Sequence, residues 1–165
     1  MMVVLGVDPG SLATGYGLIE KKGEKLICLA SGELTFRKDI LFCERIHGIY
    51  RGMVELMKRF QPAEMAIEDV FFSKNAKSSL KLGHARGAAL VAAVECGVRI
   101  FEYSPLEIKK AVVGFGGAGK VQVQSMVRCI LSQEVSGGLD ASDALAVAIC
   151  HLNWTRYEKP REAMR

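Results

Sequence analysis

The amino-acid sequence predicts an α/β fold in which helices flank a mixed five-stranded sheet. Three short apolar segments separated by small turns open the chain, and this spacing is typical of an antiparallel meander. Two further strand-like segments then alternate with helical patterns, which is the order expected of layered α/β proteins. The 165 residues, half of them hydrophobic, suffice for one compact core. We therefore expect residues 1–157 to form a single domain and residues 158–165 to form a polar C-terminal tail.

The first half of the chain supplies the meander and a long helix. Residues 2–8, 14–20 and 24–32 have the apolar content of strands, and Pro9-Gly10-Ser11 is a turn sequence. Asp39 is an N-cap residue type at the right place for the helix that follows. Apolar residues then recur at three- to four-residue intervals and give this helix one buried face. Those residues are Phe42, Ile46, Ile49, Met53, Leu56 and Phe60.

The second half alternates strands and helices after Pro62 ends the long helix. Gly97 is typical of a helix C-terminus, and Ser104 with Pro105 is typical of a helix start. The expected elements are a strand at residues 63–68, a loop at 71–77, an alanine-rich helix at 78–96, a strand at 98–103, a flexible loop at 114–119, and helices at 121–132 and 140–155.

The distribution of charge indicates an anionic partner more clearly than the total does. The formal net charge is only +4. Residues 71–94 contain four basic residues and no acid, and residues 103–128 contain four against one acid. These residues are Lys74, Lys77, Lys81 and Arg86, then Lys109, Lys110, Lys120 and Arg128. Such segments can neutralise phosphates, although a basic stretch is about as often an ordinary solvated helix face.

Composition and pattern argue against several classes of protein. No apolar run reaches the roughly 18 residues of a membrane span, and the N-terminus lacks the pattern of a signal peptide. We therefore expect a cytoplasmic protein with no membrane partner. The five cysteines are odd in number and form no C-x-x-C pair. Free thiols are therefore expected, rather than a disulfide framework or a zinc site.

Four carboxylates stand at the edges of the predicted buried elements. Asp8 ends the first strand, and Glu68 ends the strand at residues 63–68. Asp140 and Asp143 are three residues apart in the first turn of the last helix, so they lie on one side of it. Carboxylates at such positions are costly unless they are paired, and ligand sites form at the carboxyl ends of strands in open α/β sheets. We hypothesise that the four acids meet at one site.

Each acid also has a purely structural interpretation. Asp140 could be a helix cap, since acids at helix N-termini are favoured by the helix dipole. Asp8 before Pro9 and Gly10 could form an Asx turn. For any single residue the structural interpretation is the more common one. The joint pattern favours function, because acids from three distant segments would have to share one place.

A shared site of four carboxylates predicts a divalent metal centre. Mg²⁺ prefers oxygen ligands and binds through only a few carboxylates, and we expect Mn²⁺ to substitute for it. Two Mg²⁺ ions per site, about 3.5–4 Å apart, would suit phosphoryl transfer. One ion would lower the pKa of an attacking water, and the other would neutralise charge on a departing 3′ oxygen. No covalent protein nucleophile is required.

Five stretches extend this pattern over nearly the whole chain, from Val3 to about His151. They are Gly6 to Gly10 with Thr14 to Gly17; Ala66 to Glu68 with Val70 and Phe71; Asn75 and Ala76 with Leu82 to Gly87; Val112 to Gly114 with Lys120, Val123 and Gln124; and Asp140 to Ala146. In this order they resemble the RuvC family of Holliday-junction resolvases, which has the RNase H-like fold. No single stretch is specific, but the combination is.

The resemblance implies an activity and partners. It implies a metal-dependent endonuclease that resolves four-way DNA junctions by paired symmetric nicks leaving 5′ phosphates, in recombination and repair. Asp8, Glu68, Asp140 and Asp143 match the metal-binding acids of the family. A homodimer is implied, with the helix from Ser78 at or near its interface. Cooperation with a branch-migration complex of the RuvA and RuvB type is also implied.

The resemblance also implies contacts with DNA. Phe71 matches an aromatic residue that contacts the junction near the crossover, and Lys109 and Lys120 match basic residues that approach the scissile phosphates. From the residue pattern alone, we expect Phe71 to be exposed for base stacking and Phe72 to be buried. The lysines that follow Phe72 fit phosphate contacts. The full set expected to bind DNA is Phe71, Lys74, Lys77, Lys81, Arg86, Lys109 and Lys120.

Two other functions remain open on the sequence. Asp8-Pro9-Gly10-Ser11 also resembles the first phosphate loop of actin-like ATP-dependent phosphotransferases, although that fold normally needs two such domains. A junction-binding protein without catalysis is the third hypothesis, and the four intact acids argue against it. The segment from Gly114 to Lys120 nearly matches a P-loop, but Val121 replaces the Ser or Thr that would ligate Mg²⁺. We therefore do not expect ATP to bind there.

Overall fold

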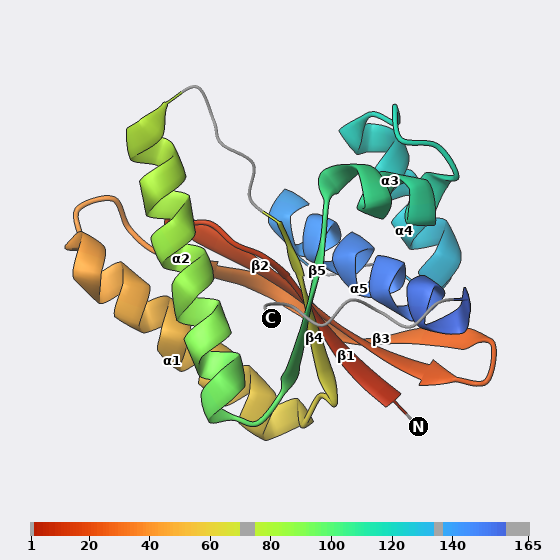
Figure 1. The fold of residues 1–165 in the computed structure, drawn as a ribbon, viewed down its shortest axis with the longest axis horizontal. Coiled ribbons are helices and arrows are strands. Elements are labelled where there is room, and N and C mark those ends of the chain that lie inside the picture. The colour runs from red at the N-terminus through yellow and green to blue at the C-terminus, as the bar shows by residue number, and fades with distance from the viewer. Residues whose placement is uncertain (1, 70–74, 134–136, 158–165) are drawn as a thin grey trace.

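The computed structural model describes residues 2–69, 75–133 and 137–157, with side chains described as far as Trp154 (Figure 1). Its centre is a five-stranded sheet in the order β3-β2-β1-β4-β5. The strands are β1 (Met2–Asp8), β2 (Ala13–Lys22), β3 (Lys25–Thr35), β4 (Glu64–Glu68) and β5 (Arg99–Tyr103). β1, β2 and β3 are antiparallel neighbours, whereas β4 and β5 run parallel to β1. The predicted mixed five-stranded sheet is confirmed.

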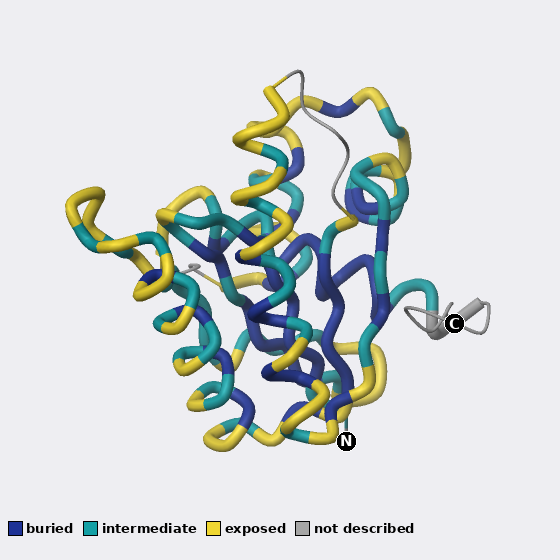
Figure 2. The backbone as a smooth tube through the Cα atoms, turned by 60° about the vertical axis from the view of Figure 1, so that its left-hand side comes forward, coloured by how far each residue is buried: buried dark blue, intermediate teal, exposed yellow. Residues whose placement is uncertain are grey.

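Helices cover both faces of this sheet (Figure 1). They are α1 (Phe42–Phe60), α2 (Ala76–Glu95), α3 (Pro105–Val113), α4 (Lys120–Leu131) and α5 (Leu139–Tyr157). Because strand side chains alternate, Leu5 and Val7 join the core beneath α1 and α2, while Val4 and Ala66 join the core beneath α3, α4 and α5. Figure 2 shows buried residues on the central strands and exposed residues along the outer helices and turns. Among the helices that the structure describes, none has the length and hydrophobicity required to cross a membrane.

The start of α1 differs from the sequence prediction. Asp39 is the predicted N-cap, but its carboxylate pairs with Arg37, and the helix begins only at Phe42. Leu41 occupies the N-cap position and makes no side-chain hydrogen bond to the helix. The prediction of Asp39 as the cap is therefore wrong, because a local ion pair engages its carboxylate.

The starts of α2 and α3 are set by capping side chains. Asn75 Oδ1 accepts hydrogen bonds from the backbone N–H groups of Lys77 at 3.0 Å and Ser78 at 3.3 Å, so α2 begins two residues before its predicted start. Ser104 caps α3 as predicted. Its hydroxyl accepts a hydrogen bond from the Glu107 N–H, and the Glu107 carboxylate accepts one from the Ser104 N–H. This reciprocal pair is a capping box.

α5 lies very close to β1 and β2, because glycines line the strand surface beneath it. A Cβ atom at Gly6 would stand 2.0 Å from the Ala144 carbonyl oxygen, and one at Gly17 would stand 2.6 Å from the Leu145 side chain. Neither position has room for a side chain. From Ala144 to Leu152 every residue of α5 is buried, since the sheet covers one side of the helix and α3 and α4 cover the other. The glycines therefore set the height of α5 above the sheet.

A buried polar network ties α5 to β4 and β5. His151 Nε2 lies 2.6 Å from a carboxylate oxygen of Glu64, and His151 Nδ1 lies 2.7 Å from the Tyr103 hydroxyl. Burial lowers the pKa of His151 despite its contact with Glu64, so the imidazole is neutral at pH 7. The ring then donates to Glu64 and accepts from Tyr103. No sequence motif indicates this network, which holds α5 in register along the two strands.

Candidate active site

Two of the predicted acids end neighbouring strands. Asp8 is the last residue of β1 and Glu68 is the last residue of β4. These strands are parallel, with Val7 opposite Ile67. The residues that follow them, Asp8 and Glu68, therefore lie at the same carboxyl edge of the sheet. Side chains alternate along a strand, and Gly6 lies beneath α5. Asp8 therefore points to the face that α5 covers.

Gly15 allows the first turn of α5 to reach these strand ends. It pairs with Asp8 in the antiparallel register of β1 and β2, and a Cβ atom on it would stand 2.0 Å from the Asp140 carbonyl oxygen. The helix backbone thus passes directly over the strand position beside Asp8. As a result, carboxylate oxygens of Asp8, Asp140 and Asp143 lie within 4.8 Å of one another. Within the described part of the chain, no other set of three or more acids, histidines and cysteines gathers this closely.

Glu68 joins the site on the other side of Asp8. A pocket of about 170 Å³ opens at the carboxyl edge of the sheet. Its lining residues are Asp8, Glu68, Pro105, Ile108, Lys109, Lys120, Val123, Asp143, Ala146 and Val147. Asp8 and Asp143 thus belong both to this pocket and to the close group with Asp140. The structure therefore brings the four predicted acids together as two overlapping sets. One set is Asp8, Asp140 and Asp143, and the other is Asp8, Glu68 and Asp143.

Burial, together with neighbouring negative charge, raises the pKa values of Asp8, Glu68 and Asp140. The pKa of Asp8 rises from 3.8 to about 8, mainly because the carboxyl is buried and then because Glu68, Asp143 and Asp140 repel its charge. Burial is also the main cause that raises the pKa of Glu68 and that of Asp140. Complete ionisation of the cluster at neutral pH therefore needs additional positive charge.

Two lysines supply part of that charge. Lys120 Nζ lies 2.8 Å from Asp143 Oδ2, and this contact raises the pKa of the lysine. The Lys120 side chain is 68% exposed, so it can reach an incoming phosphate without any change in the core. Lys109 borders the pocket, and together with Lys120 it lowers the pKa of Glu68 against the larger effect of burial. The site therefore combines buried acids with accessible lysines.

Glu33 is a fifth acid beside the site, and sequence reasoning missed it. Its carboxylate accepts a hydrogen bond from the Asp140 backbone N–H at 3.2 Å and contributes to the raised pKa of Asp140. Gly15 pairs with Asp8 on one side and with Glu33 on the other, so the three residues form one row across the sheet. The register of the opening hairpins, read from the alternation of their side chains, could have placed Glu33 on this face.

The remaining predicted DNA-binding residues lie on or before α2. Lys77 and Lys81 are exposed on its first turns, where their ammonium groups are accessible to a ligand. Arg86 forms an ion pair with Glu102 of β5, and only 16% of its side chain is exposed. Its charge is therefore engaged within the chain. Three residues of this region, Phe71, Phe72 and Lys74, lie outside the described residues.

The glycine-rich segment at residues 114–119 connects two helices. α3 ends at Val113 and α4 begins at Lys120, whereas a P-loop joins a strand to a helix. Lys120, the residue that would stand where a P-loop lysine does, is paired with Asp143 instead. The structural context of this segment is therefore not that of an ATP-binding loop.

The set of donor atoms fits a hard divalent cation. Asp8, Asp140 and Asp143 offer only carboxylate oxygens, which Mg²⁺ and Mn²⁺ prefer and which suit softer metals less well. The mutual repulsion that helps to raise the pKa of Asp8 to about 8 would be relieved by a positive ion placed among these carboxylates. Glu68 lines the pocket that Asp8 and Asp143 also line, so its carboxylate lies beside the same group.

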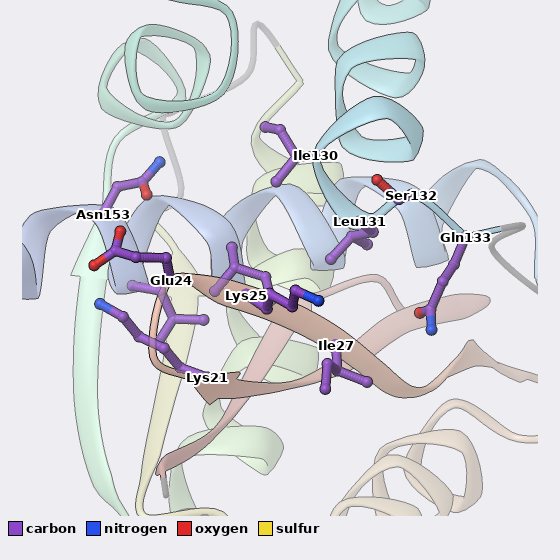
Figure 3. Close-up of a pocket in the computed structure, with 11 residues that line it drawn as sticks. Lys21, Glu24, Lys25, Ile27, Ile130, Leu131, Ser132, Gln133 and Asn153 are labelled. Atoms are coloured by element: carbon purple, nitrogen blue, oxygen red, sulfur yellow. The ribbon is translucent and has the colours of Figure 1, made fainter.

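A larger hollow lies away from the acids. It has a volume of about 570 Å³ and is bordered by the β2–β3 turn and by residues near the ends of α4 and α5 (Figure 3). Its charged lining residues are Lys21, Glu24 and Lys25, so it offers one carboxylate between two lysines. Volume alone does not make it a metal site, and we place the chemistry at the smaller pocket where the acids converge.

Relatives in other organisms resemble this chain over nearly its whole length. The family model described as crossover junction endodeoxyribonuclease RuvC matches residues 4–151. The protein of that name from Geotalea uraniireducens is 49% identical over 152 residues, which are 92% of this chain and 89% of the relative. The protein of the same name from Pelotomaculum thermopropionicum is 43% identical over 159 residues, which are 96% of this chain and 97% of the relative.

Solved structures show the same architecture. T. thermophilus RuvC in complex with a Holliday junction substrate has 36% sequence identity and a TM-score of 0.89, over 98% of this chain and all of that chain. The yeast mitochondrial Holliday junction resolvase Ydc2 has a TM-score of 0.65 at 14% identity, over 93% of this chain and 78% of that chain. The second match concerns the fold alone. The first confirms the expected RNase H-like fold.

Proposed function

The chain belongs to the RuvC family of crossover junction endodeoxyribonucleases, and we propose that it resolves four-way (Holliday) DNA junctions in recombination and repair. The reaction is a metal-dependent hydrolysis of DNA phosphodiester bonds, and the products are paired symmetric nicks with 5′ phosphates. One observation carries the proposal at the level of chemistry. Carboxylates from β1, β4 and α5, which are far apart in the sequence, converge at one edge of the sheet.

We assign the four acids to two Mg²⁺ positions, at which Mn²⁺ can substitute. Asp8 and Asp143 belong to both overlapping sets of acids, and these two, together with Asp140 and Glu68, would hold the cations. When bound, the cations lower the pKa of an attacking water and neutralise charge on the departing 3′ oxygen. Glu33 steadies Asp140 by accepting the hydrogen bond of its backbone N–H.

The lysines of the site bind the scissile phosphate. Lys109 and Lys120 border the pocket that Asp8, Glu68 and Asp143 line. Their charges draw the phosphodiester towards the acids, which would otherwise repel it. Moving from Asp143 to a phosphate oxygen, Lys120 exchanges one anionic partner for another. The lysines thus make the approach of a polyanion to an acidic site favourable.

The junction arms extend from this pocket onto α2. Lys77 and Lys81 are exposed on the first turns of that helix, and Figure 1 shows the start of α2 and the α3–α4 pair on opposite sides of the end of β4. Contacts from both sides would hold DNA across the acids. We also retain Phe71 as a DNA-binding residue on the family resemblance, and Lys74 and Arg86 on the basic pattern of the sequence.

We propose a homodimer that places two such sites on opposed strands. The outward side of α2 has an apolar hollow of about 590 Å³ lined by Ala76, Ser79, Leu80, Gly83, His84 and Gly87. Leu80 is 65% exposed, and a Cβ atom at Gly83 or Gly87 would meet nothing within 4 Å. A second α2 could therefore approach closely and bury Leu80. Light scattering should give twice the chain mass for the wild type, and Leu80→Glu should shift it to the monomer.

Cooperation with a branch-migration complex of the RuvA and RuvB type follows from the family resemblance and remains a prediction, as does the cytoplasmic location. Purified complex of this type, loaded on a junction, should raise the rate of nicking by the chain at subsaturating concentration. An unchanged rate would argue against a functional partnership.

The deciding experiment offers the protein a labelled four-way junction and a linear duplex of the same sequence, with and without Mg²⁺. We expect two symmetric nicks in the junction only, only with the metal, and products that ligase reseals because they keep 5′ phosphates. Absence of cleavage with Mg²⁺ and with Mn²⁺ would exclude the nuclease function. Binding without cleavage would then favour a non-catalytic junction protein, and a thermal shift caused by ATP would favour a phosphotransferase.

A further inference from the structure

The helix pair α3–α4, which forms one wall of the acidic pocket, displays large apolar side chains to solvent. Leu106 on α3 is 52% exposed, Phe115 in the loop at residues 114–119 is 50% exposed, and Val121 on α4 is 75% exposed. Single exposed apolar residues are ordinary, but a contiguous group beside a site marks a binding surface more often.

The loop backbone packs directly against Leu106. A Cβ atom at Gly116 would stand 2.1 Å from Leu106 Cδ1 and 3.6 Å from Lys110 Cε. Glycine at this position therefore lets the loop lie on the Leu106 side chain, next to the lysine. Phe115 is the adjacent residue of the same loop, and we call Leu106, Phe115 and the neighbouring Lys110 the shelf.

The loop is anchored at three points, which keeps Phe115 outside the core. Gly114 ends α3 in the left-handed conformation, with φ of 92°. At the other end, the Gly119 N–H donates a hydrogen bond of 2.8 Å to the Gln122 side chain. Between them Ala118 is buried to 1% exposure. These anchors fix the path of the loop, and Phe115 remains half exposed.

The helix pair that carries the shelf also forms one wall of the acidic pocket. Pro105, Ile108 and Lys109 of α3 line the pocket, and so do Lys120 and Val123 of α4. The loop joins these two helices, so the shelf belongs to the helix pair that carries the pocket lysines. A strand that occupies the pocket therefore lies against the helix pair on which the shelf stands.

The charge around the shelf identifies an anionic partner. Lys109, Lys110 and Lys120 lie within five residues of Phe115 or Leu106 in the sequence, and Glu107 is the one acid of α3. Its carboxylate is engaged at the start of that helix, where it accepts hydrogen bonds from the Ser104 N–H at 2.8 Å and the Ser104 hydroxyl at 2.7 Å. An aromatic ring among lysines suits nucleic acid, which offers both phosphates and bases with flat apolar faces.

We propose that Phe115, supported by Leu106, stacks on a base of the DNA strand that enters the acidic pocket. This inference rests on the proposed function and deepens it, because it names a residue that holds the substrate strand beside the acids. Stacking on a base does not depend on its identity, so the contact supplies affinity and alignment of the strand without selecting a sequence. A base that is unpaired at the crossover presents the required face.

The test compares Phe115→Ala with Phe115→Trp on a fluorescent four-way junction. Without metal, the alanine variant should bind the junction about ten-fold more weakly, and the tryptophan variant should bind within two-fold of the wild type. With Mg²⁺, the KM of the alanine variant should rise by the same factor, and its kcat should change little. Leu29→Ala, at an exposed apolar residue of β3, is the matched control and should bind as the wild type does.

A fluorescent adenine analogue next to the crossover reports the stacking itself. The wild type should quench its emission, and Phe115→Ala should restore most of the emission at saturating protein. Unchanged binding and quenching in Phe115→Ala, or equal losses in the alanine and tryptophan variants, would overturn the inference. Because binding is measured without metal, these outcomes stand apart from the proposed function, which fails only if the wild type does not cut.

Discussion

Lys120 Nζ lies 2.8 Å from Asp143 Oδ2, at the edge of a cluster in which burial and repulsion raise the pKa of Asp8 to about 8. The lysine partly neutralises the acids and remains accessible, because 68% of its side chain is exposed. In the proposed reaction its charge has two opposite effects. It draws the phosphate to the site, and it weakens the attraction of the acids for divalent cations.

Changing Lys120→Gln should separate these two effects. If the Lys120 ammonium group contacts the scissile phosphate as proposed, its loss should lower kcat for junction cleavage by roughly 100-fold. The Mg²⁺ concentration for half-maximal rate should fall or stay the same, because a competing positive charge has been removed. Lys58→Gln, in the last turn of α1, is the control and should leave both values unchanged. A higher Mg²⁺ requirement in Lys120→Gln would contradict this assignment.

Gly15→Ala should damage both stability and cleavage. The added Cβ would stand 2.0 Å from the Asp140 carbonyl oxygen, and a helix backbone cannot move aside as a flexible side chain can. We expect the free energy of unfolding to fall by about 1–3 kcal/mol. The rate of junction cleavage should fall even where the protein remains folded, because α5 must move Asp140 away from Asp8.

Gly117→Ala provides the comparison for Gly15→Ala. Its Cβ would make only ordinary contacts, at 3.8 Å or more from the Phe115 ring, so denaturant unfolding should match the wild type within about 0.5 kcal/mol. Wild-type stability and activity in Gly15→Ala would show that the close approach of α5 to β2 is not required.

Without metal, stability should fall as the pH rises because of Asp8. The Asp8 carboxyl has a pKa of about 8 in the folded chain and 3.8 as its ordinary value. The folded state therefore binds this proton more tightly, and the resulting stability is complete below pH 4 and is lost as the pH rises through 8. Asp8→Asn removes this dependence and should raise the free energy of unfolding at pH 8 in EDTA by ~2–4 kcal/mol.

Denaturant unfolding of both proteins between pH 5 and 9 measures this effect of Asp8. The difference between Asp8→Asn and the wild type should grow with pH in EDTA. Saturating Mg²⁺ should reduce or reverse it, because the cation then neutralises the cluster of the wild type. A difference that is independent of pH, or unaffected by Mg²⁺, would mean that Asp8 is not part of a crowded metal-binding cluster.

Tyr103→Phe tests the network that ties α5 to the strands. It removes the hydroxyl 2.7 Å from His151 Nδ1 and leaves a buried acceptor without its donor. The expected cost is about 1–3 kcal/mol, measured by chemical unfolding at pH 7. Tyr50→Phe removes a hydroxyl that contacts Glu95 at the surface and should cost less than about 0.5 kcal/mol. Equal effects of the two changes would show that the buried network adds nothing.

Local patterns predict much of this fold. Apolar alternation locates the five strands, and Ser104 with Pro105 locates the start of α3, because these features act within a few residues. Asp39 shows the limit of such reasoning. Its residue type suits an N-cap, but it pairs with Arg37, a competing contact that the pattern does not reveal. The start of α2 also differs from the predicted one, because the Asn75 side chain caps the helix two residues earlier.

The acids of the site could be predicted because each stands at a recognisable boundary of an element. Asp8 and Glu68 end strands, and Asp140 and Asp143 begin a helix. Glu33 stands within β3, and its place beside Asp140 depends on the register of two hairpins. Gly15 has its role only once α5 lies over it. Such contacts arise from tertiary packing, and sequence spacing alone does not contain them.

The most direct test of the metal site is junction cleavage by Asp8→Asn under conditions in which binding is measured in parallel. Asparagine keeps the size of the side chain but removes the charge from Asp8, which with Asp143 belongs to both overlapping sets of acids. We predict that the variant binds a labelled four-way junction as tightly as the wild type, because affinity comes mainly from basic contacts, and that it shows no nicking with Mg²⁺. Normal cleavage by Asp8→Asn would contradict the metal site described here.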